Sequence, residues 1–191
     1  MTISNIVEIN RVLERDRTDT TYKFALLRGA ADIAQQHNPY TAEGRVWYKT
    51  GLMVEKWLEY YYPIFDSDVF IPQKNGEMPL SHDGKNVSFR RKFKRLTDYY
   101  SSRGGFNAFW TQYKNGTIDE EINDACLDLV KDIWRTITYY PMKHLGYSIK
   151  NEHYSYFGYA ERKPIRSGTP FSRELLVDRF GDFWMDGDFW R

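Results

Sequence analysis

The sequence has few of the features that cross-link a protein, anchor it in a membrane or give it a strong charge. Its one cysteine, Cys126, excludes an internal disulfide framework and the multi-cysteine zinc folds. No stretch approaches the about 18 apolar residues that a transmembrane helix needs. The 27 Lys and Arg residues balance 26 Asp and Glu residues to a net charge of +1, so any argument for nucleic-acid binding must rest on local patches.

Several catalytic and targeting signatures are also missing. There is no Gly-rich dinucleotide or Walker-type loop and no Gly-x-Ser-x-Gly nucleophile elbow. The first residues, 1–5, do not begin a charged segment followed by an apolar one, so we expect no signal peptide and a cytoplasmic protein. We expect no cofactor in this chain and no contact with a membrane.

Aromatic residues are abundant instead. The chain of 191 residues holds 15 Tyr, 12 Phe and 6 Trp, although its mean hydropathy is only −0.67. Disordered chains are poor in aromatic residues, so we expect a folded protein whose core is built largely from rings. The length favours one core of useful size.

Apolar residues recur at intervals of three and four along most of the chain, which is the spacing of helices that bury one face. We predict helices over 4–14, 20–36, 52–62, 87–100, 106–113, 117–141 and 172–180. Pro63 should end the third helix, Thr117 and Glu120 should form a capping box, and Ser172 should cap the last helix. Residues 66–86 contain turn-forming residues and predict an exposed loop.

The expected fold is mainly α, a multi-helix domain with a small β hairpin near its C-terminal end, around Tyr154 to Tyr159. We expect the helical domain over 1–160, a linker over 161–171, and the start of a second element or a tail over 172–191. Because the chain ends on aromatic residues, Phe183 to Trp190, soon after this element begins, we expect more chain or a partner subunit beyond it.

The strongest candidate for a contact surface lies between residues 85 and 103, where seven basic residues face one acidic residue, Asp98. On a helix, several of these cations should lie away from the apolar residues Phe89 and Phe93 and follow a phosphate backbone. The expected DNA contacts in this segment are Lys85, Arg90, Arg91, Lys94, Arg95 and Arg103. The alternative is a solvated helix face neutralised by the acidic residues of the helix at 117–141, namely Asp119, Glu120, Glu121, Asp124, Asp128 and Asp132.

A second and weaker basic region is centred on Lys23 and Arg28. These side chains also stand as candidate DNA contacts, although nearby acidic residues favour internal ion pairs. The helix start at 20–23 is an alternative phosphate site, with Lys23 as the countercharge.

Three further groups of residues are explained without a catalytic or metal-binding role. The aspartates near the C-terminus do not have the spacing of a metal loop and read as turn residues, namely Asp178, Asp182, Asp186 and Asp188. Cys126 falls on the apolar stripe of its helix and predicts a buried, inert thiol. His82 and Asp83 precede a glycine and are explained by a turn.

Five runs of residues carry a resemblance to a known family. They are Arg17 to Arg28 (RTDTTYKFALLR), Leu52 to Pro63, Ile71-Pro72-Gln73, Arg103-Gly104-Gly105-Phe106, and Pro141 to Gly146 (PMKHLG). Together they resemble the N-terminal region of bacterial HNH-endonuclease-domain proteins of the restriction or phage-defence kind, over roughly residues 1–160. The resemblance implies a helical recognition scaffold and places the catalytic His residues and Mg²⁺, or another divalent metal, in a separate nuclease part. No HNH catalytic motif is found among the four His residues of this chain.

The sequence therefore predicts a non-catalytic DNA-recognition or scaffolding region of an HNH-type DNA endonuclease, and whether the chain itself is an enzyme stays open. Its expected partners are DNA and a nuclease domain or partner subunit, and a homo-oligomer is left open. The alternative is a protein-interaction module that docks on another subunit through aromatic residues, without DNA.

Overall fold

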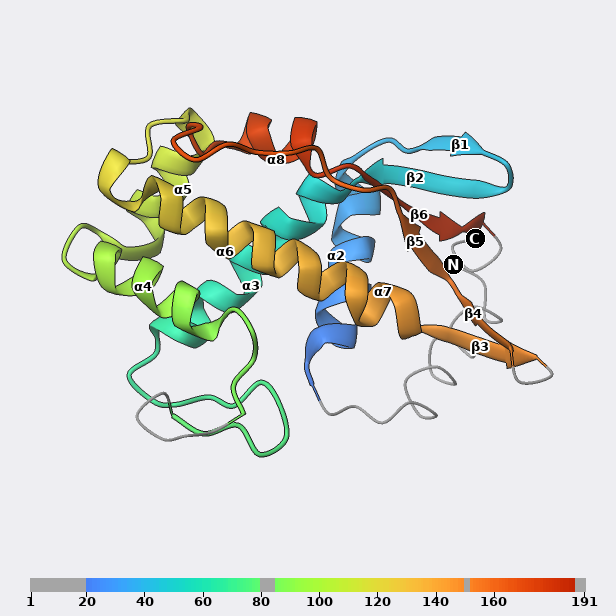
Figure 1. Ribbon diagram of the computed structural model, residues 1–191, viewed down its shortest axis with the longest axis horizontal. Coiled ribbons are helices and arrows are strands. Elements are labelled where there is room, and N and C mark those ends of the chain that lie inside the picture. Colours follow the sequence, from blue (N-terminus) through green and yellow to red (C-terminus); the bar gives the residue numbers. More distant parts are fainter. Residues whose placement is uncertain (1–19, 80–84, 150–151, 188–191) are drawn as a thin grey trace.

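The computed structural model describes residues 20–79, 85–149 and 152–187 (Figure 1). Within these ranges the protein is mainly α-helical, as predicted, and carries a four-stranded antiparallel sheet beside the helices. The helix predicted over 4–14 lies outside the described residues.

The helices follow the periodicity of the sequence closely. They are α2 (Tyr22–Gln36), α3 (Thr50–Asp66), α4 (Arg90–Ser101), α5 (Gly105–Asn115), α6 (Glu120–Tyr139), α7 (Pro141–His144) and α8 (Arg173–Arg179). The long helix α3 packs against α2, α4, α6 and α8, so it is the centre of the helical part. In Figure 1, α6 crosses in front of α3, and α4 and α5 lie at the opposite end from the sheet.

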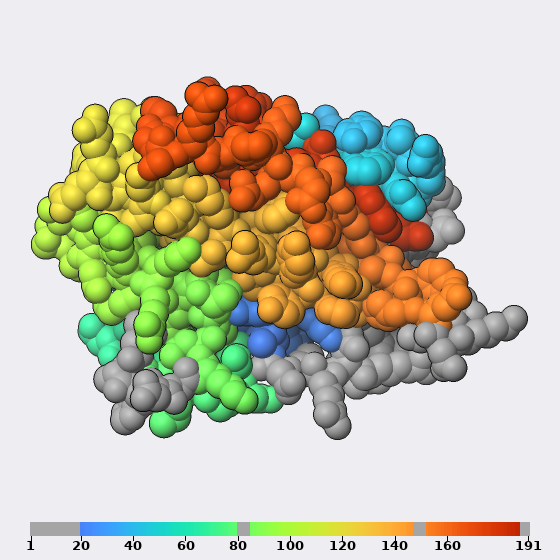
Figure 2. Space-filling view, viewed as in Figure 1, coloured from blue at the N-terminus to red at the C-terminus, as the bar shows by residue number. Residues whose placement is uncertain are grey.

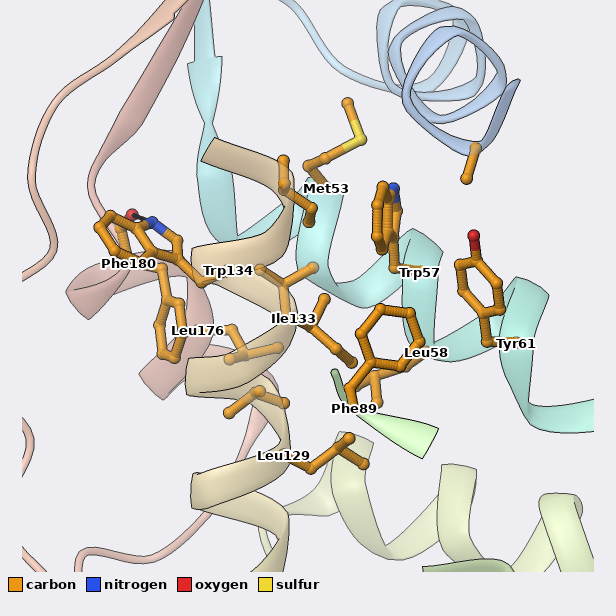
Figure 3. Close-up of a cluster of buried hydrophobic side chains, with 14 of the residues drawn as sticks. Met53, Trp57, Leu58, Tyr61, Phe89, Leu129, Ile133, Trp134, Leu176 and Phe180 are labelled. Carbon is orange, nitrogen blue, oxygen red and sulfur yellow. Dashed lines mark hydrogen bonds between the residues drawn. The ribbon is translucent and has the colours of Figure 1, made fainter. Parts of the chain in front are cut away.

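Aromatic rings fill the core, as the composition predicts. Trp57 and Tyr61 on α3 contact Phe89, which lies just before α4, with ring centres 6.0 and 5.1 Å away. Figure 3 shows these rings beside Ile133 of α6. Trp134 faces the other side of α6, where its indole N–H donates to the carbonyl of Phe180 at 3.1 Å. The core therefore extends from α3 through α6 to the C-terminal segment.

Capping contacts and burial decide the outcome of three predicted helix boundaries. The prediction that Pro63 ends the third helix is wrong, because α3 continues past Pro63 and buries Phe65 against the rings of Phe89 and Phe93. The predicted capping box is wrong, since α6 begins at Glu120 and its N-cap is Asp119. The Ser172 cap is confirmed by its side chain, which accepts the N–H of Leu175 at 3.2 Å.

The sheet joins distant parts of the chain. Its strand order is β1 (Tyr40–Ala42), β2 (Arg45–Lys49), β6 (Asp182–Asp186) and β5 (Phe157–Tyr159), all antiparallel. One face packs on the core through Tyr48, Phe183 and Met185, and the other carries Arg45, Trp47 and Trp184. The predicted hairpin near the C-terminal end is present as β3 (Gly146–Ile149) and β4 (Glu152–Ser155). The four-stranded sheet was not predicted.

The segment after β5 lies on the same core as the helices. Residues 161–171, expected as a linker, are fastened to α6 by Asn123, whose side-chain oxygen accepts the N–H of Phe171 and whose amide donates to the carbonyl of Thr169. Residues 172–187, expected as a second element or tail, supply α8 and β6. Phe183 is completely buried, so it is not part of an exposed aromatic tail.

Candidate nucleic-acid interface

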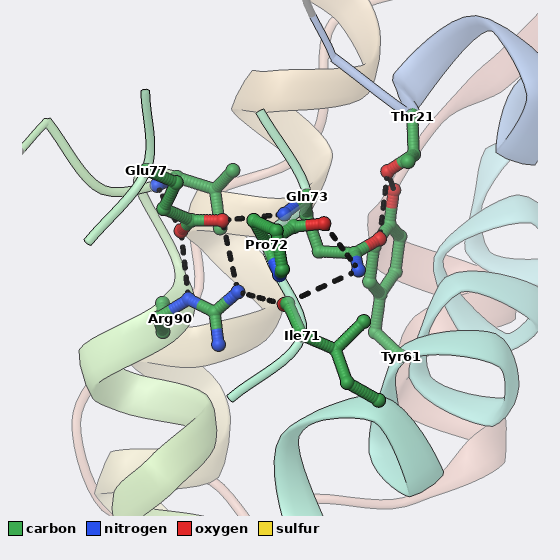
Figure 4. Close-up of polar contacts among 8 residues, drawn as sticks. Thr21, Tyr61, Ile71, Pro72, Gln73, Glu77 and Arg90 are labelled. Carbon is green, nitrogen blue, oxygen red and sulfur yellow. Dashed lines mark hydrogen bonds and ion pairs between the residues drawn. The ribbon is translucent and has the colours of Figure 1, made fainter. Parts of the chain in front are cut away.

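The prediction that Arg90 contacts DNA is wrong, because its side chain is inside the protein. Arg90 is 6% exposed and its guanidinium lies 4.4 and 4.6 Å from the ring centres of Phe65 and Phe70. It is the first residue of α4 and extends back toward residues 67–79, where it pairs with Glu77 (Figure 4). Helical spacing within α4 alone predicts a solvent-facing side chain here, and the contacts with residues 67–79 bury it instead.

Glu77 organises the segment that was expected to be an exposed loop. One carboxylate oxygen accepts from Arg90 Nε at 2.7 Å and from the Val87 N–H at 2.9 Å, and the other accepts from Arg90 Nη2 and the Gln73 N–H. Burial of Glu77 opposes its ionisation, but the hydrogen bonds from Arg90 and the two backbone N–H groups outweigh it and lower the pKa. Gln73 is in turn bonded to the hydroxyl of Thr21, which contacts Tyr61. The start of α4 is therefore fixed by a buried polar network.

The other cations predicted to bind DNA in the 85–103 segment are exposed, and two of them, Lys94 and Arg103, contact neighbouring groups of the protein. Lys94 pairs with Asp98 at 2.5 Å on the same helix. Arg103 donates to the carbonyl of Tyr99 and stacks on its ring, with 4.1 Å from the guanidinium carbon to the ring centre. Exposed Lys85, Arg91 and Arg95 complete the set.

Helix α6 partly neutralises α4, as the alternative interpretation expected. The ammonium group of Lys92 lies 2.7 Å from a carboxylate oxygen of Asp132. Just before α4, the hydroxyl of Ser88 lies 2.7 Å from the hydroxyl of Thr136 on α6. These contacts show that the beginning of α4 lies beside the end of α6.

Cations nevertheless outnumber carboxylates where the two helices meet. Residues 91, 92 and 95 share one face of α4, and residues 128, 131, 132 and 135 share one face of α6. We name the resulting surface the basic seam, which consists of Arg91, Lys92, Arg95, Lys131 and Arg135, with Asp128 and Asp132 among them. Arg91, Arg95 and Arg135 are exposed and form no ion pair with any described residue. Figure 2 shows α4 in green and α6 in yellow to orange, side by side on one face.

Two exposed tyrosines continue the surface beyond the seam. Tyr139 is 52% exposed and follows Arg135 by one helical turn, and Tyr140 is 58% exposed. Large aromatic side chains with this exposure beside cations are the composition of surfaces that stack on unpaired bases.

The weaker basic region lies on α2. The guanidinium of Arg28 covers the ring of Tyr60 at 4.3 Å, and the hydroxyl of Tyr60 donates to Asp32. Lys23 is half-buried and has an interaction of its own. The helix start at 20–23 is the alternative phosphate site, which would use backbone N–H groups, and one of these, the Thr21 N–H, donates to the carbonyl of Gln73 at 3.0 Å. This region belongs to a different helix from the basic seam.

The remaining candidate site residues either lie on different elements or are buried. Asp178 lies on α8, whereas Asp182 lies in β6 and pairs with Lys49 at 2.9 Å. Among the described residues, no group of three or more His, Cys, Asp or Glu side chains is placed to hold a metal ion. Cys126 is buried as predicted, and burial raises the pKa of its thiol to about 12. Asp188, His82 and Asp83 lie outside the described residues.

A pocket that was not predicted from the sequence lies where α7 meets the strands β4, β5 and β6. His144 of α7 and His153 of β4 lie with their ring centres 6.2 Å apart at a pocket of about 550 Å³. We name it the histidine pocket, and its described lining is Met142, Lys143, His144, His153, Ser155, Phe157, Gly158, Tyr159 and Trp184. The sequence signal was weak, because the two histidines meet only when the hairpin between them folds.

Comparison with known proteins gives one match. The model of a family described as a domain of unknown function, DUF8808, matches residues 3–191. No curated protein and no solved structure matches the chain. The resemblance to HNH-endonuclease-domain proteins stays a prediction. In the part of the chain that is described, no helix has both the length and the apolar character to cross a bilayer.

Proposed function

This chain belongs to the DUF8808 family, and we propose that it is a DNA-binding domain whose basic seam follows a phosphate backbone. The observation that carries the proposal is the arrangement of Arg91, Arg95 and Arg135. They are exposed, form no ion pair with a described residue, and surround the Lys92–Asp132 pair that joins their helices. Guanidinium groups held on two packed helices can contact successive phosphates without ordering a loop first.

Phosphate contacts of this kind act mainly through charge. Each neutralised phosphate releases condensed counterions, so affinity falls with salt by a slope of roughly 0.7–0.9 per contact on logarithmic axes. The exposed rings of Tyr139 and Tyr140 add stacking on unpaired bases. The proposed ligand is therefore DNA with at least one unpaired stretch, bound with little dependence on sequence.

The wider role that we propose is recognition for a catalytic part located elsewhere. In this role the domain presents DNA to an HNH-type nuclease domain or partner subunit, which holds the divalent metal, in restriction or phage defence. The support for this role is the resemblance of residues 1–160 alone. One of its runs, Ile71-Pro72-Gln73, belongs to the network that fixes the start of α4, since the Ile71 carbonyl accepts from Arg90 at 2.7 Å.

The test is a titration of single-stranded and duplex DNA at about 50 mM and about 200 mM salt, which brackets the range where phosphate contacts weaken strongly. The seam variant carries Arg91→Ala, Arg95→Ala and Arg135→Ala. The control variant removes the same charge elsewhere, with Lys114→Ala, Lys163→Ala and Arg179→Ala. We expect salt-sensitive binding that the seam variant loses and the control retains. Absence of binding at low salt, or equal loss in both variants, would refute the proposal.

A second candidate function is supported by exposed apolar side chains on residues 67–79. Val69 is 70% exposed, and Met78 and Ile71 are also exposed, on a segment that Glu77 and Arg90 hold rigidly. Such a preformed apolar surface suits docking on another subunit. Docking through it depends little on salt, so the same salt series, run with a candidate subunit in place of DNA, separates the two functions.

A further inference from the structure

The histidine pocket has the size and the lining of a small-ligand site. Its volume of about 550 Å³ falls within the roughly 300–1,000 Å³ of typical ligand pockets. Helix α7 supplies Lys143 and His144, the hairpin supplies His153, and the sheet supplies its aromatic wall. The hydroxyl of Ser155 fastens the hairpin to α7 by contacts with the carbonyls of Met142 and Leu145.

The polar side of the pocket favours an anion. Lys143, His144 and His153 are exposed and present N–H donors, and no carboxylate is found among the described lining residues. The nearest acidic residue along the hairpin, Glu152, accepts a hydrogen bond from the Tyr154 hydroxyl at 2.6 Å. A phosphate group matches three donors that line one pocket without an opposing charge.

The other side of the pocket favours a planar, apolar group. Phe157, Tyr159 and Trp184 line it, and Trp184 is held in place from two directions. The guanidinium of Arg45 lies 4.1 Å from the indole ring centre, and Gly158 lies so close that an added Cβ would collide with the ring. A fixed aromatic wall beside an anion site is complementary to a base that carries a phosphate.

The pocket lies beside the helix that carries Arg135. Tyr159 of the pocket contacts Trp134 of α6, with ring centres 5.8 Å apart. Helix α7, which lines the pocket, begins two residues after Tyr139, and Tyr139 follows Arg135 by one helical turn. A strand that leaves the seam at Arg135 can therefore reach the pocket past Tyr139.

We propose that the histidine pocket binds a nucleoside monophosphate, either free or as the phosphorylated end of a DNA strand that lies on the basic seam. The base packs against the aromatic wall, and the phosphate accepts hydrogen bonds from Lys143, His144 and His153. Only the second source rests on the proposed function, because a free nucleotide needs no contact with the seam.

The first experiment titrates the full chain with AMP, adenosine and inorganic phosphate, followed by calorimetry and by the NMR signals of the histidine side chains. We expect AMP to bind at least about tenfold more tightly than adenosine or phosphate, and the signals of His144 and His153 to move. The double variant His144→Gln and His153→Gln should weaken AMP binding at least about tenfold. Both histidines are exposed, so this variant should fold normally.

The seam variant is the matched control, because it changes residues outside the pocket and should bind AMP as the unchanged protein does. No AMP binding up to about 10 mM, or binding that the double histidine variant leaves intact, would overturn the proposal. AMP binding without DNA binding would overturn the proposed function but would still support the proposal for the histidine pocket.

The second experiment distinguishes the two sources by comparing oligonucleotides with a phosphorylated or an unphosphorylated end. Tighter binding of the phosphorylated strand, lost in the double histidine variant, assigns the pocket to strand ends. Equal binding of the two strands, together with AMP binding, assigns it to free nucleotides.

Discussion

Glu77 and Arg90 form a buried ion pair in which Arg90 Nε lies 2.7 Å from one carboxylate oxygen and Nη2 lies 2.9 Å from the other. The pair connects residues 67–79, which contain no helix, to the first turn of α4. Because α4 carries Arg91 and Arg95, a contact hidden from solvent positions the exposed cations of the basic seam. Arg90, which was predicted to contact DNA, thus holds the other predicted DNA contacts of α4 in place from inside the protein.

Removing one partner of this pair should destabilise the fold strongly. Arg90→Ala leaves the buried Glu77 carboxylate without its charge partner, and we expect the free energy of unfolding to fall by about 3–5 kcal/mol. Urea unfolding followed by circular dichroism measures it. The neighbouring Arg91→Ala is the control and should change stability by less than about 0.5 kcal/mol, since Arg91 is exposed. Equal effects of the two substitutions would contradict the buried role of Arg90.

The same pair predicts how stability depends on pH. Hydrogen bonds from Arg90 and the Gln73 and Val87 N–H groups outweigh burial and lower the folded-state pKa of Glu77 below its ordinary value of 4.5. The stabilisation from the ionised carboxylate is therefore complete above about pH 5.5 and is lost as the pH falls below 4.5 through the lowered pKa. The measurement is the difference in unfolding free energy between the unchanged protein and Glu77→Gln at a series of pH values. A difference that grows toward acid pH would have the wrong sign.

The helices could be predicted from the sequence because each carries its own periodic apolar face. In α6, Ile122, Cys126, Leu129 and Ile133 are all buried, at the spacing that the sequence displays. The sheet could not be predicted in the same way. β2 and β6 have five residues each, and their pairing joins residues 45–49 to 182–186, so neither strand has a local signal for its partner.

The residues of the candidate site differ in the same way, because some follow from local spacing and others depend on tertiary contacts. Exposure of Arg91 and Arg95 follows from the helical spacing of α4, but burial of Arg90 depends on Glu77, which lies 13 residues earlier in a loop. The histidine pocket depends on α7, the hairpin and the two strands β5 and β6, so His144 and His153 carried little signal as single residues. Local periodicity therefore identifies which cations share a helix face, and only tertiary contacts decide which of them remain available.

A glycine in α3 provides a test of the contact between α3 and α8. Glycine inside a helix is ordinarily less stable than alanine by about 1 kcal/mol, so Gly51→Ala should stabilise an isolated helix. Here an added Cβ would collide with the carbonyl group of Leu176 in α8. We expect Gly51→Ala to lower the free energy of unfolding by about 1–3 kcal/mol, measured by urea titration. Stabilisation by this substitution would show that the two helices do not approach so closely.

Cys126 should be unreactive toward thiol reagents while the protein is folded. Burial raises the pKa of its thiol to about 12, against a smaller opposing effect of Arg95. The thiolate, which is the reactive form, is therefore scarce at pH 8, and the side chain is 1% exposed. A thiol reagent that gives a coloured product should label the folded chain very slowly and the urea-unfolded chain completely within minutes. Rapid labelling of the folded chain would contradict the burial.

Asp132 offers a gain-of-affinity test of the basic seam. Its carboxylate neutralises Lys92 at 2.7 Å in the middle of the seam, so Asp132→Asn should free Lys92 for an additional phosphate contact. We expect tighter DNA binding at low salt and a salt dependence steeper by roughly 0.7–0.9 on logarithmic axes, the contribution of one phosphate. Because the pair is partly exposed, its loss should cost less than about 1 kcal/mol of stability.

The matched control is Glu174→Gln, which removes one exposed carboxylate from α8 and changes the net charge equally. If the seam binds the phosphates, Asp132→Asn raises affinity and Glu174→Gln leaves the salt slope unchanged, because only the first substitution adds a contact. If both variants raise affinity alike, binding responds to net charge alone and the seam is not the binding surface. A gain in DNA affinity with a steeper salt dependence, found for Asp132→Asn alone, is produced neither by misfolding nor by general electrostatic attraction. This substitution is therefore the sharpest test of where DNA lies.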